Sequence, residues 1–249
     1  MFSNSIKYKK ERILRVHVLN NSSGIQTGTG FFIEKGRIFL TCFHVIFGTE
    51  LKNLRVLPAF ISAAGSTEHE KLLNYFKSSI TKIEVESQDS TKYELELKDF
   101  NESFDIVSLK IKDPNINTDN IKSCVMKNDV LGQGDNVFFG GFPVCAGYEA
   151  IESPFAINIG MVSSFPKIIV GGDKYEHIQI NTINLGGNSG APLFRLNSNK
   201  VIGIINGNMN WGRDDLLSNE NIPVFFRVPL SIAYATSIKT ITQETNILK

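Results

Sequence analysis

Short runs of alternating apolar and polar residues dominate this chain. Residues 13–19 (ILRVHVL), 82–86 and 92–97 place apolar side chains at every second position, which is typical of strands with one buried face. Other β-like runs are residues 28–33, 37–41, 51–60, 104–111, 136–139, 157–162, 167–170, 177–183, 193–194, 200–205 and 223–228. Turn signals separate these runs roughly every ten residues, which favours an all-β protein of barrels or sandwiches.

Two segments interrupt this pattern with helical features. Residues 67–79 (TEHEKLLNYFKSS) carry an apolar face of two leucines and a phenylalanine, which predicts a helical insertion between strands. Pro229 and Ser231 read as a start signal, so we predict a short C-terminal helix over residues 231–239.

The polar stretch 113–120 reads as a connection between two halves of one domain. We place the N-terminal half at about residues 11–112 and the C-terminal half at about 124–230, followed by the helix to about 240.

Composition narrows the class of protein. The 249 residues suffice for one large domain or two packed halves, and a net charge of +1 gives no reason to expect nucleic acid or an anionic membrane as partner. Residues 1–15 are basic without a following apolar run, and the longest largely apolar stretch, 38–47, is half of the ~20 residues that span a bilayer. We therefore expect a cytoplasmic protein.

The chain has three cysteines, Cys42, Cys124 and Cys145. They are too few and too scattered for a disulfide framework or a zinc site, so we expect buried free thiols. No cluster of histidines and carboxylates has ligand spacing, and we expect neither a metal nor another cofactor.

Residues 186–193 (GGNSGAPL) form the most informative stretch. Three glycines around Ser189 predict a tight turn that exposes the hydroxyl and leaves backbone N–H groups unpaired beside it. Acyl transfer needs this combination of nucleophile and oxyanion hole. A glycine-rich turn alone is more often only a turn, so the hypothesis needs support from elsewhere in the chain.

That support comes from two titratable residues in apolar surroundings. His44 lies at an apolar strand end, and Asp105 lies between Phe104 and Ile106. Burying a carboxylate there is costly unless a partner hydrogen-bonds it. His44, Asp105 and Ser189 would satisfy one another if they met, and their chain order on an all-β background is that of the chymotrypsin-like double barrel.

Several motifs in order extend this likeness. They are residues 28–33 (GTGFFI), 38–45 (IFLTCFHV), 105–110 (DIVSLK), 141–143 (GFP), 159–163 (IGMVS), 187–193 (GNSGAPL), 201–204 (VIGI) and 228–229 (VP). With these motifs the chain resembles trypsin-like, chymotrypsin-fold serine proteases, and it is most similar to the HtrA/Deg group of bacterial peptidase domains. The likeness runs from about residue 13 to residue 235.

The resemblance implies two six-stranded antiparallel β-barrels and a serine endopeptidase that works through an acyl-enzyme. Ser189 would be the nucleophile, His44 the general base and Asp105 the orienting carboxylate, with the N–H groups of Gly187 and Ser189 as the oxyanion hole. Its substrate would be a protein or peptide.

Three further residues are expected to bind that substrate. Ile183 and Phe225 would line the primary pocket, where no acidic residue is obvious, so we expect a small or apolar residue before the scissile bond. Asn206 would lie on the strand edge that receives the substrate backbone and would also support Asp105.

The chain departs from the family pattern in three places. Asn188 replaces the aspartate of zymogen-activated members, so activation by clipping is not expected. Ala191 stands where glycine is usual; we expect its single methyl group to be tolerated, and the alternative is that it crowds the turn. The interval between His44 and Asp105 is longer than in HtrA relatives, mainly through residues 67–79, which would be a lid, a docking helix or decoration. If a regulatory protein partner is needed, we expect it to contact either residues 67–79 or the loop near residues 207–221, which carries Trp211.

Two other classes compete with the protease. A latent or inactive protease fold would act as a binding module that needs a partner to order its oxyanion loop. An esterase of the α/β-hydrolase class is disfavoured because the second residue after Ser189 is alanine and strands do not alternate with helices.

Overall fold

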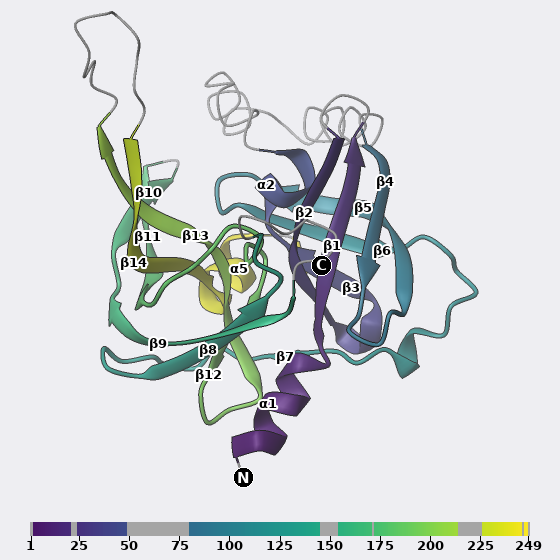
Figure 1. The fold of residues 1–249 in the computed structure, drawn as a ribbon, viewed down its shortest axis with the longest axis horizontal. Coiled ribbons are helices and arrows are strands. Elements are labelled where there is room, and N and C mark those ends of the chain that lie inside the picture. Colours follow the sequence, from purple (N-terminus) through teal and green to yellow (C-terminus); the bar gives the residue numbers. More distant parts are fainter. Residues whose placement is uncertain are drawn as a thin grey trace, which may run out of the picture.

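The computed structural model describes residues 2–20, 24–48, 80–144, 154–170, 172–213, 226–245 and 247–248. These residues form two β-barrels that lie side by side (Figure 1). The all-β prediction of two six-stranded antiparallel barrels is confirmed. The predicted strand over residues 51–60 and the predicted helical insertion over 67–79 lie outside the described residues.

The first barrel is closed by its earliest strand. In spatial order its strands are β1 (Ile13–Asn20), β2 (Gly24–Ile33), β3 (Ile38–Thr41), β6 (Ile106–Ile111), β5 (Lys92–Asn101) and β4 (Ile80–Glu86). Val16 of β1 pairs with Gly28 on one side and with Val85 on the other, so β1 joins β2 and β4. The short 3-10 helix η1 (Glu34–Gly36) makes the β2–β3 turn, and α2 (Phe43–Phe47) follows β3.

The second barrel closes in the same way. Its six strands are β8 (Asn136–Gly141), β9 (Ala156–Ser164), β11 (Asp173–Asn181), β14 (Phe226–Ser237), β13 (Lys200–Arg213) and β12 (Pro192–Arg195). Ile180 of β11 pairs with Val162 of β9 and with Ala233 of β14, which completes the ring. Two short strands extend it: β10 (Lys167–Val170) pairs with β11, and β7 (Val125–Met126) runs parallel to β13. Between the barrels, η3 (Thr118–Asn120) interrupts the connection.

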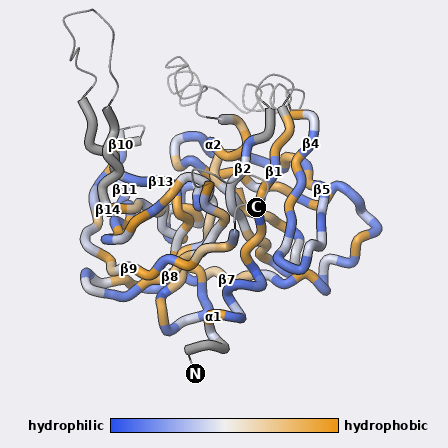
Figure 2. Tube along the Cα trace, viewed as in Figure 1, coloured by the Kyte–Doolittle hydropathy of each residue, from blue (hydrophilic) through white to orange (hydrophobic). Residues whose placement is uncertain are grey.

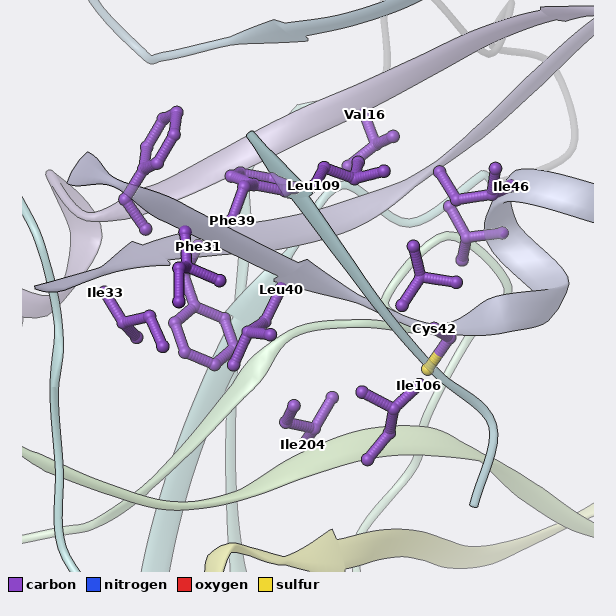
Figure 3. Close-up of a cluster of buried hydrophobic side chains, with 14 of the residues drawn as sticks. Val16, Phe31, Ile33, Phe39, Leu40, Cys42, Ile46, Ile106, Leu109 and Ile204 are labelled. Carbon is purple, nitrogen blue, oxygen red and sulfur yellow. The ribbon is translucent and has the colours of Figure 1, made fainter. Parts of the chain in front are cut away.

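The core follows the alternation seen in the sequence. Hydrophobic and hydrophilic residues alternate along the strands (Figure 2). One buried cluster fills the first barrel and continues into the second, where Ile204 of β13 lies beside Leu40, Cys42 and Ile106 (Figure 3). The barrels therefore share apolar packing at the interface where the site is built.

The C-terminal helix is displaced from the predicted position. Residues 231–237 continue β14, and the helix is α5 (Ile238–Glu244). The prediction over 231–237 was wrong because β14 is paired on both sides, with Ala235 opposite both Ile178 and Ile205, and such pairing outweighs a local start signal. Ser237 begins the helix, because its side chain accepts a hydrogen bond from the Thr240 N–H.

An N-terminal helix, α1 (Phe2–Lys10), was not predicted. Its Lys9 is only 1% exposed, and the Nζ atom donates to Ser5 Oγ and to the Leu196 carbonyl. The ammonium also lies 5.6 and 5.7 Å from the ring centroids of Phe138 and Phe194. Burial lowers the pKa of Lys9. Among the described helices, none has the length and apolar character needed to cross a bilayer.

Candidate active site

His44 and Asp105 meet where the first barrel faces the second. His44 Nδ1 lies 2.7 Å from Asp105 Oδ2, and the His44 N–H donates to Asp105 Oδ1 at 3.0 Å. The two side chains are 16% and 18% exposed. Both carboxylate oxygens therefore hold the same histidine, one through its ring and one through its backbone.

The local fold around His44 explains this double contact. The strand ends at Thr41, and His44 lies in the first turn of α2 rather than at a strand end as predicted. The first N–H groups of a helix have no partner within it, so the His44 N–H is free to bond a carboxylate. Gly48, at φ +78°, ends the helix after five residues.

Asp105 has an unusual backbone. Its φ of +55° lies in the left-handed region, which costs a non-glycine residue free energy unless its surroundings impose it. The Asp105 N–H donates to the Glu102 carbonyl at 3.0 Å, and Phe104 and Ile106 on either side are buried. The neighbouring core therefore fixes the direction of the carboxylate.

The loop around Ser189 needs glycine at two positions. Gly187 has φ +94° and Gly190 φ +88°. A Cβ on Gly187 would lie 2.3 Å from the Phe142 carbonyl oxygen, and one on Gly190 would lie 2.0 Å from that of Thr29. Among the described residues, neither the Gly187 nor the Ser189 N–H donates to a protein group. The loop thus presents two backbone donors beside the serine.

Ser189 Oγ is turned toward the second barrel. It donates to the Asn206 carbonyl at 3.3 Å, and no hydrogen bond joins it to His44 in the described part of the chain. Since Asn206 Nδ2 lies 3.4 Å from the Asp105 carbonyl oxygen, Asn206 touches both ends of the predicted triad.

The Asn206 side chain joins the two barrels. Its Oδ1 accepts from the Thr236 N–H at 2.7 Å and from Thr236 Oγ1 at 2.9 Å, while Nδ2 faces the carbonyls of Phe104 and Asp105 and the Cys42 sulfur. It contacts Asp105 through the main chain, not through the carboxylate.

The other two predicted substrate-binding residues are Ile183 and Phe225. Ile183 follows β11 and is 62% exposed, whereas Phe225 lies outside the described residues. The sequence did not single out Asn184 and Asn208, which make two mutual hydrogen bonds: Asn184 Nδ2 donates to Asn208 Oδ1 at 3.0 Å, and Asn208 Nδ2 donates to the Asn184 carbonyl at 2.6 Å. They tie the loop before Ser189 to β13.

The two substitutions in the nucleophile loop are accommodated. Asn188 is 1% exposed, and its Oδ1 has no hydrogen-bond partner among the residues that the structure describes. A neutral amide occupies such a position at lower cost than a carboxylate. Ala191 is fully buried within the core of the second barrel, and its N–H donates to the Asn188 carbonyl at 3.0 Å. The methyl group therefore packs rather than crowds the turn.

One group of side chains has the donor types of a metal site. Cys42 Sγ, a ring nitrogen of His44 and an Asp105 carboxylate oxygen lie within 4.8 Å of one another, a grouping that the sequence spacing did not reveal. The thiol donates to the Ile205 carbonyl at 3.2 Å, and His44 Nδ1 and Asp105 Oδ2 bond each other. Cys42 and Cys124 are buried and form no disulfide within the described part of the chain, while Cys145 lies outside it.

Comparisons with known proteins identify the family. Residues 28–204 match the family model of the trypsin-like peptidase domain. The chain is 26% identical over 200 residues to serine protease HTRA1B of Danio rerio, an alignment that covers 77% of this chain and 32% of the relative. It thus spans about a third of that protein.

Two solved structures share the fold. The active form of the Rv3671c protease from M. tuberculosis superposes with a TM-score of 0.61 at 15% identity, over 96% of this chain and 81% of that one. The serine endoprotease from Yersinia pestis gives 0.62 at 18% identity, over 98% and 64%. The family model covers well over half of the residues, and the chain belongs to the trypsin-like peptidase domain family of serine proteases.

Proposed function

We propose that this domain is a serine endopeptidase that cleaves polypeptides through an acyl-enzyme on Ser189. The observation that carries the proposal is the pair formed by His44 Nδ1 and Asp105 Oδ2 at 2.7 Å, with the second carboxylate oxygen on the His44 N–H. This arrangement keeps the proton on Nδ1 and leaves Nε2 as a base for the serine hydroxyl.

The chemistry follows in two steps. Ser189 Oγ attacks the peptide carbonyl carbon while His44 Nε2 takes the hydroxyl proton, and the carbonyl becomes a tetrahedral oxyanion. His44 then gives the proton to the leaving amine as the C–N bond breaks. A water molecule, deprotonated by the same nitrogen, then attacks the acyl carbon; the bond to Ser189 Oγ breaks, His44 returns the proton to Oγ, and the product acid leaves. Asp105 holds the ring and stabilises its positive charge.

The Gly187 and Ser189 N–H groups would receive the oxyanion. In support of this role, neither N–H donates to any residue within the described ranges. Loss of one such donor slows related enzymes roughly 10²–10³-fold. Because Ile183 is expected near the primary pocket and no acidic residue is obvious there in the sequence, we expect a small or apolar residue before the scissile bond.

A latent protease fold that acts as a binding module is the second candidate. It is favoured by the hydrogen bond from Ser189 Oγ to the Asn206 carbonyl, because attack requires the hydroxyl to turn toward His44. Catalytic hydrogen bonds often form only with substrate present, so this orientation suits a resting enzyme as well. In both cases, activation by clipping is not expected with Asn188 before the serine.

Labelling with a fluorophosphonate probe separates the two candidates. We expect stoichiometric labelling of the purified domain, lost in both Ser189→Ala and His44→Ala. Cleavage of an unfolded protein substrate by the same preparation then establishes peptidase activity. A folded wild-type protein that neither labels nor cleaves would reject the enzyme and favour the binding module.

A further inference from the structure

Thr29 is a buried residue beside the loop of Ser189, and the proposed chemistry does not use its hydroxyl. It lies on β2 between two glycines and is 0% exposed. Gly28 and Gly30 have no room for a side chain, since a Cβ would lie 2.5 Å from Val45 or 2.3 Å from the Phe39 ring. Tight packing on both sides holds Thr29 in one place.

Four hydrogen bonds surround this residue. Its N–H donates to the Ser189 carbonyl at 2.9 Å, and its Oγ1 donates to the Gly187 carbonyl at 2.7 Å. The same Oγ1 accepts from the Phe142 N–H at 3.3 Å, and the Thr29 carbonyl accepts from Thr41 Oγ1 at 2.7 Å. Every polar atom of Thr29 is therefore in use, and two of the bonds reach the loop of the nucleophile.

Those two bonds enclose the peptide unit that carries the Ser189 N–H. Thr29 binds the Gly187 carbonyl on one side of that unit and the Ser189 carbonyl on the other. Because peptide units are planar and trans, fixing the two neighbouring units limits the rotation of the unit between them. Thr29 thus restricts the direction of one oxyanion donor.

The second donor is restrained through the same hydroxyl. The Gly186 carbonyl shares a peptide unit with the Gly187 N–H and accepts from the Val144 N–H at 2.8 Å. Phe142, two residues before Val144, donates its N–H to Thr29 Oγ1. The hydroxyl therefore connects segment 142–144 to residues 186–189, the two parts of the chain whose spacing sets the Gly187 N–H.

We infer that Thr29 is the positioning residue that orders the oxyanion loop, a role that rests on the proposed peptidase function. Its hydroxyl bridges the Phe142 N–H and the Gly187 carbonyl from within the other barrel. The loop is then held without an ion pair at Asn188, since a neutral hydroxyl supplies one donor and one acceptor at its base.

The test compares Thr29→Val, which removes the hydroxyl at similar volume, with Thr29→Ser, which keeps it. For Thr29→Val we expect fluorophosphonate labelling and kcat to fall roughly 10- to 100-fold, since a misplaced oxyanion donor approaches the effect of a lost one. KM should change less than about twofold, because Thr29 touches no substrate. Thr29→Ser should stay within about threefold of the wild type.

Thr245→Val is the matched control. Thr245 is a buried threonine whose Oγ1 donates to the Ile241 carbonyl at 2.6 Å, at the far end of α5. It loses a comparable hydroxyl bond and should keep wild-type labelling. A folded Thr29→Val that labels at the wild-type rate would overturn the inference, as would a Thr29→Ser that falls as far as the valine.

Hydrogen exchange of residues 186–190 gives a readout that does not depend on catalysis. We expect faster exchange there in Thr29→Val and not in Thr245→Val. If the wild type fails to label, the proposed function fails, and exchange alone then decides on Thr29. Unchanged exchange in Thr29→Val would overturn the inference in either case.

Discussion

Replacing Asn206 with alanine tests how the two barrels hold the site together. In the β13–β14 ladder the register shifts between Ile205 and Gly207, so Asn206 has no partner of its own on β14. The Asn206 side chain supplies a hydrogen-bond acceptor for β14 at this bulge, because its Oδ1 accepts from the Thr236 N–H at 2.7 Å.

The expected cost follows from the groups left unpaired. Thr236 is fully buried, so its N–H would lose its partner in a place that excludes water. The Thr236 hydroxyl keeps an alternative acceptor, the Phe104 carbonyl at 3.3 Å. The Asn206 Nδ2 contacts with carbonyl oxygens are long, at 3.4 Å, and add little. One orphaned buried donor costs about 1–3 kcal/mol, and we expect a loss of about 2 kcal/mol in unfolding free energy.

Urea unfolding measures this loss, with fluorescence and circular dichroism compared to check that the transitions coincide. Asn117→Ala is a suitable control, since the exposed Asn117 accepts one backbone N–H, from Asp119 at 3.0 Å, and should cost below about 1 kcal/mol. We also expect slower probe labelling in Asn206→Ala, because the backbone of Asp105 loses a contact. A stability within about 0.5 kcal/mol of the wild type would refute the reasoning, because the Thr236 donor would then be satisfied without Asn206.

Two further predictions concern buried titratable groups. Burial lowers the pKa of His177 below its ordinary 6.5, against the opposing charge of Asp105. As the pH falls, His177 is therefore protonated in the unfolded chain before it is protonated in the folded protein. Its contribution to the free energy of unfolding is complete above pH 6.5 and is lost as the pH falls below that value. His177→Gln should lose less stability than the wild type between about pH 7.5 and pH 5 in urea titrations. The loss is reduced rather than abolished, since the pKa of His17 is also lowered; identical pH profiles would contradict this. Burial also raises the pKa of the Cys124 thiol to about 12, so mass-spectrometric mapping should find it unmodified by a disulfide reagent in the folded protein and modified after unfolding. Rapid modification in the native state would show that the thiol is accessible.

The local pattern of apolar and polar residues predicts much of the fold, and the elements that it does not predict have a common cause. The alternation in residues 82–86 and 92–97 corresponds to β4 and β5 because one face of each strand enters the barrel. The helix prediction over residues 231–237 was wrong because the pairing of this segment with β11 and β13 cannot be read from its own sequence. The helix α1 shows no apolar stripe in the sequence, because one of its buried side chains is a lysine. Lys9 contacts Phe138 and Phe194, which lie far along the chain.

Some residues of the candidate site could be predicted from the sequence, and others could not. His44 and Asp105 stand out because a titratable side chain among apolar neighbours needs a partner, and each is that partner for the other. Ser189 stands out through its glycines. Asn184 and Thr29 could not be identified in this way, because asparagine in a loop and threonine in a strand are common. Their hydrogen-bond partners are 24 and 158 residues away in the sequence.

The position of α1 has a consequence for the order in which the protein folds. The hydrogen bond from Lys9 to the Leu196 carbonyl spans 187 residues, although α1 directly precedes the first barrel in the chain. During synthesis the first barrel can form once Ile111 has emerged, whereas the contacts that bury Lys9 need β8 and β12. Contacts of such sequence separation form late because loop closure is costly. Docking of α1 is therefore a late folding step, taken after its own neighbours in the sequence are already in place.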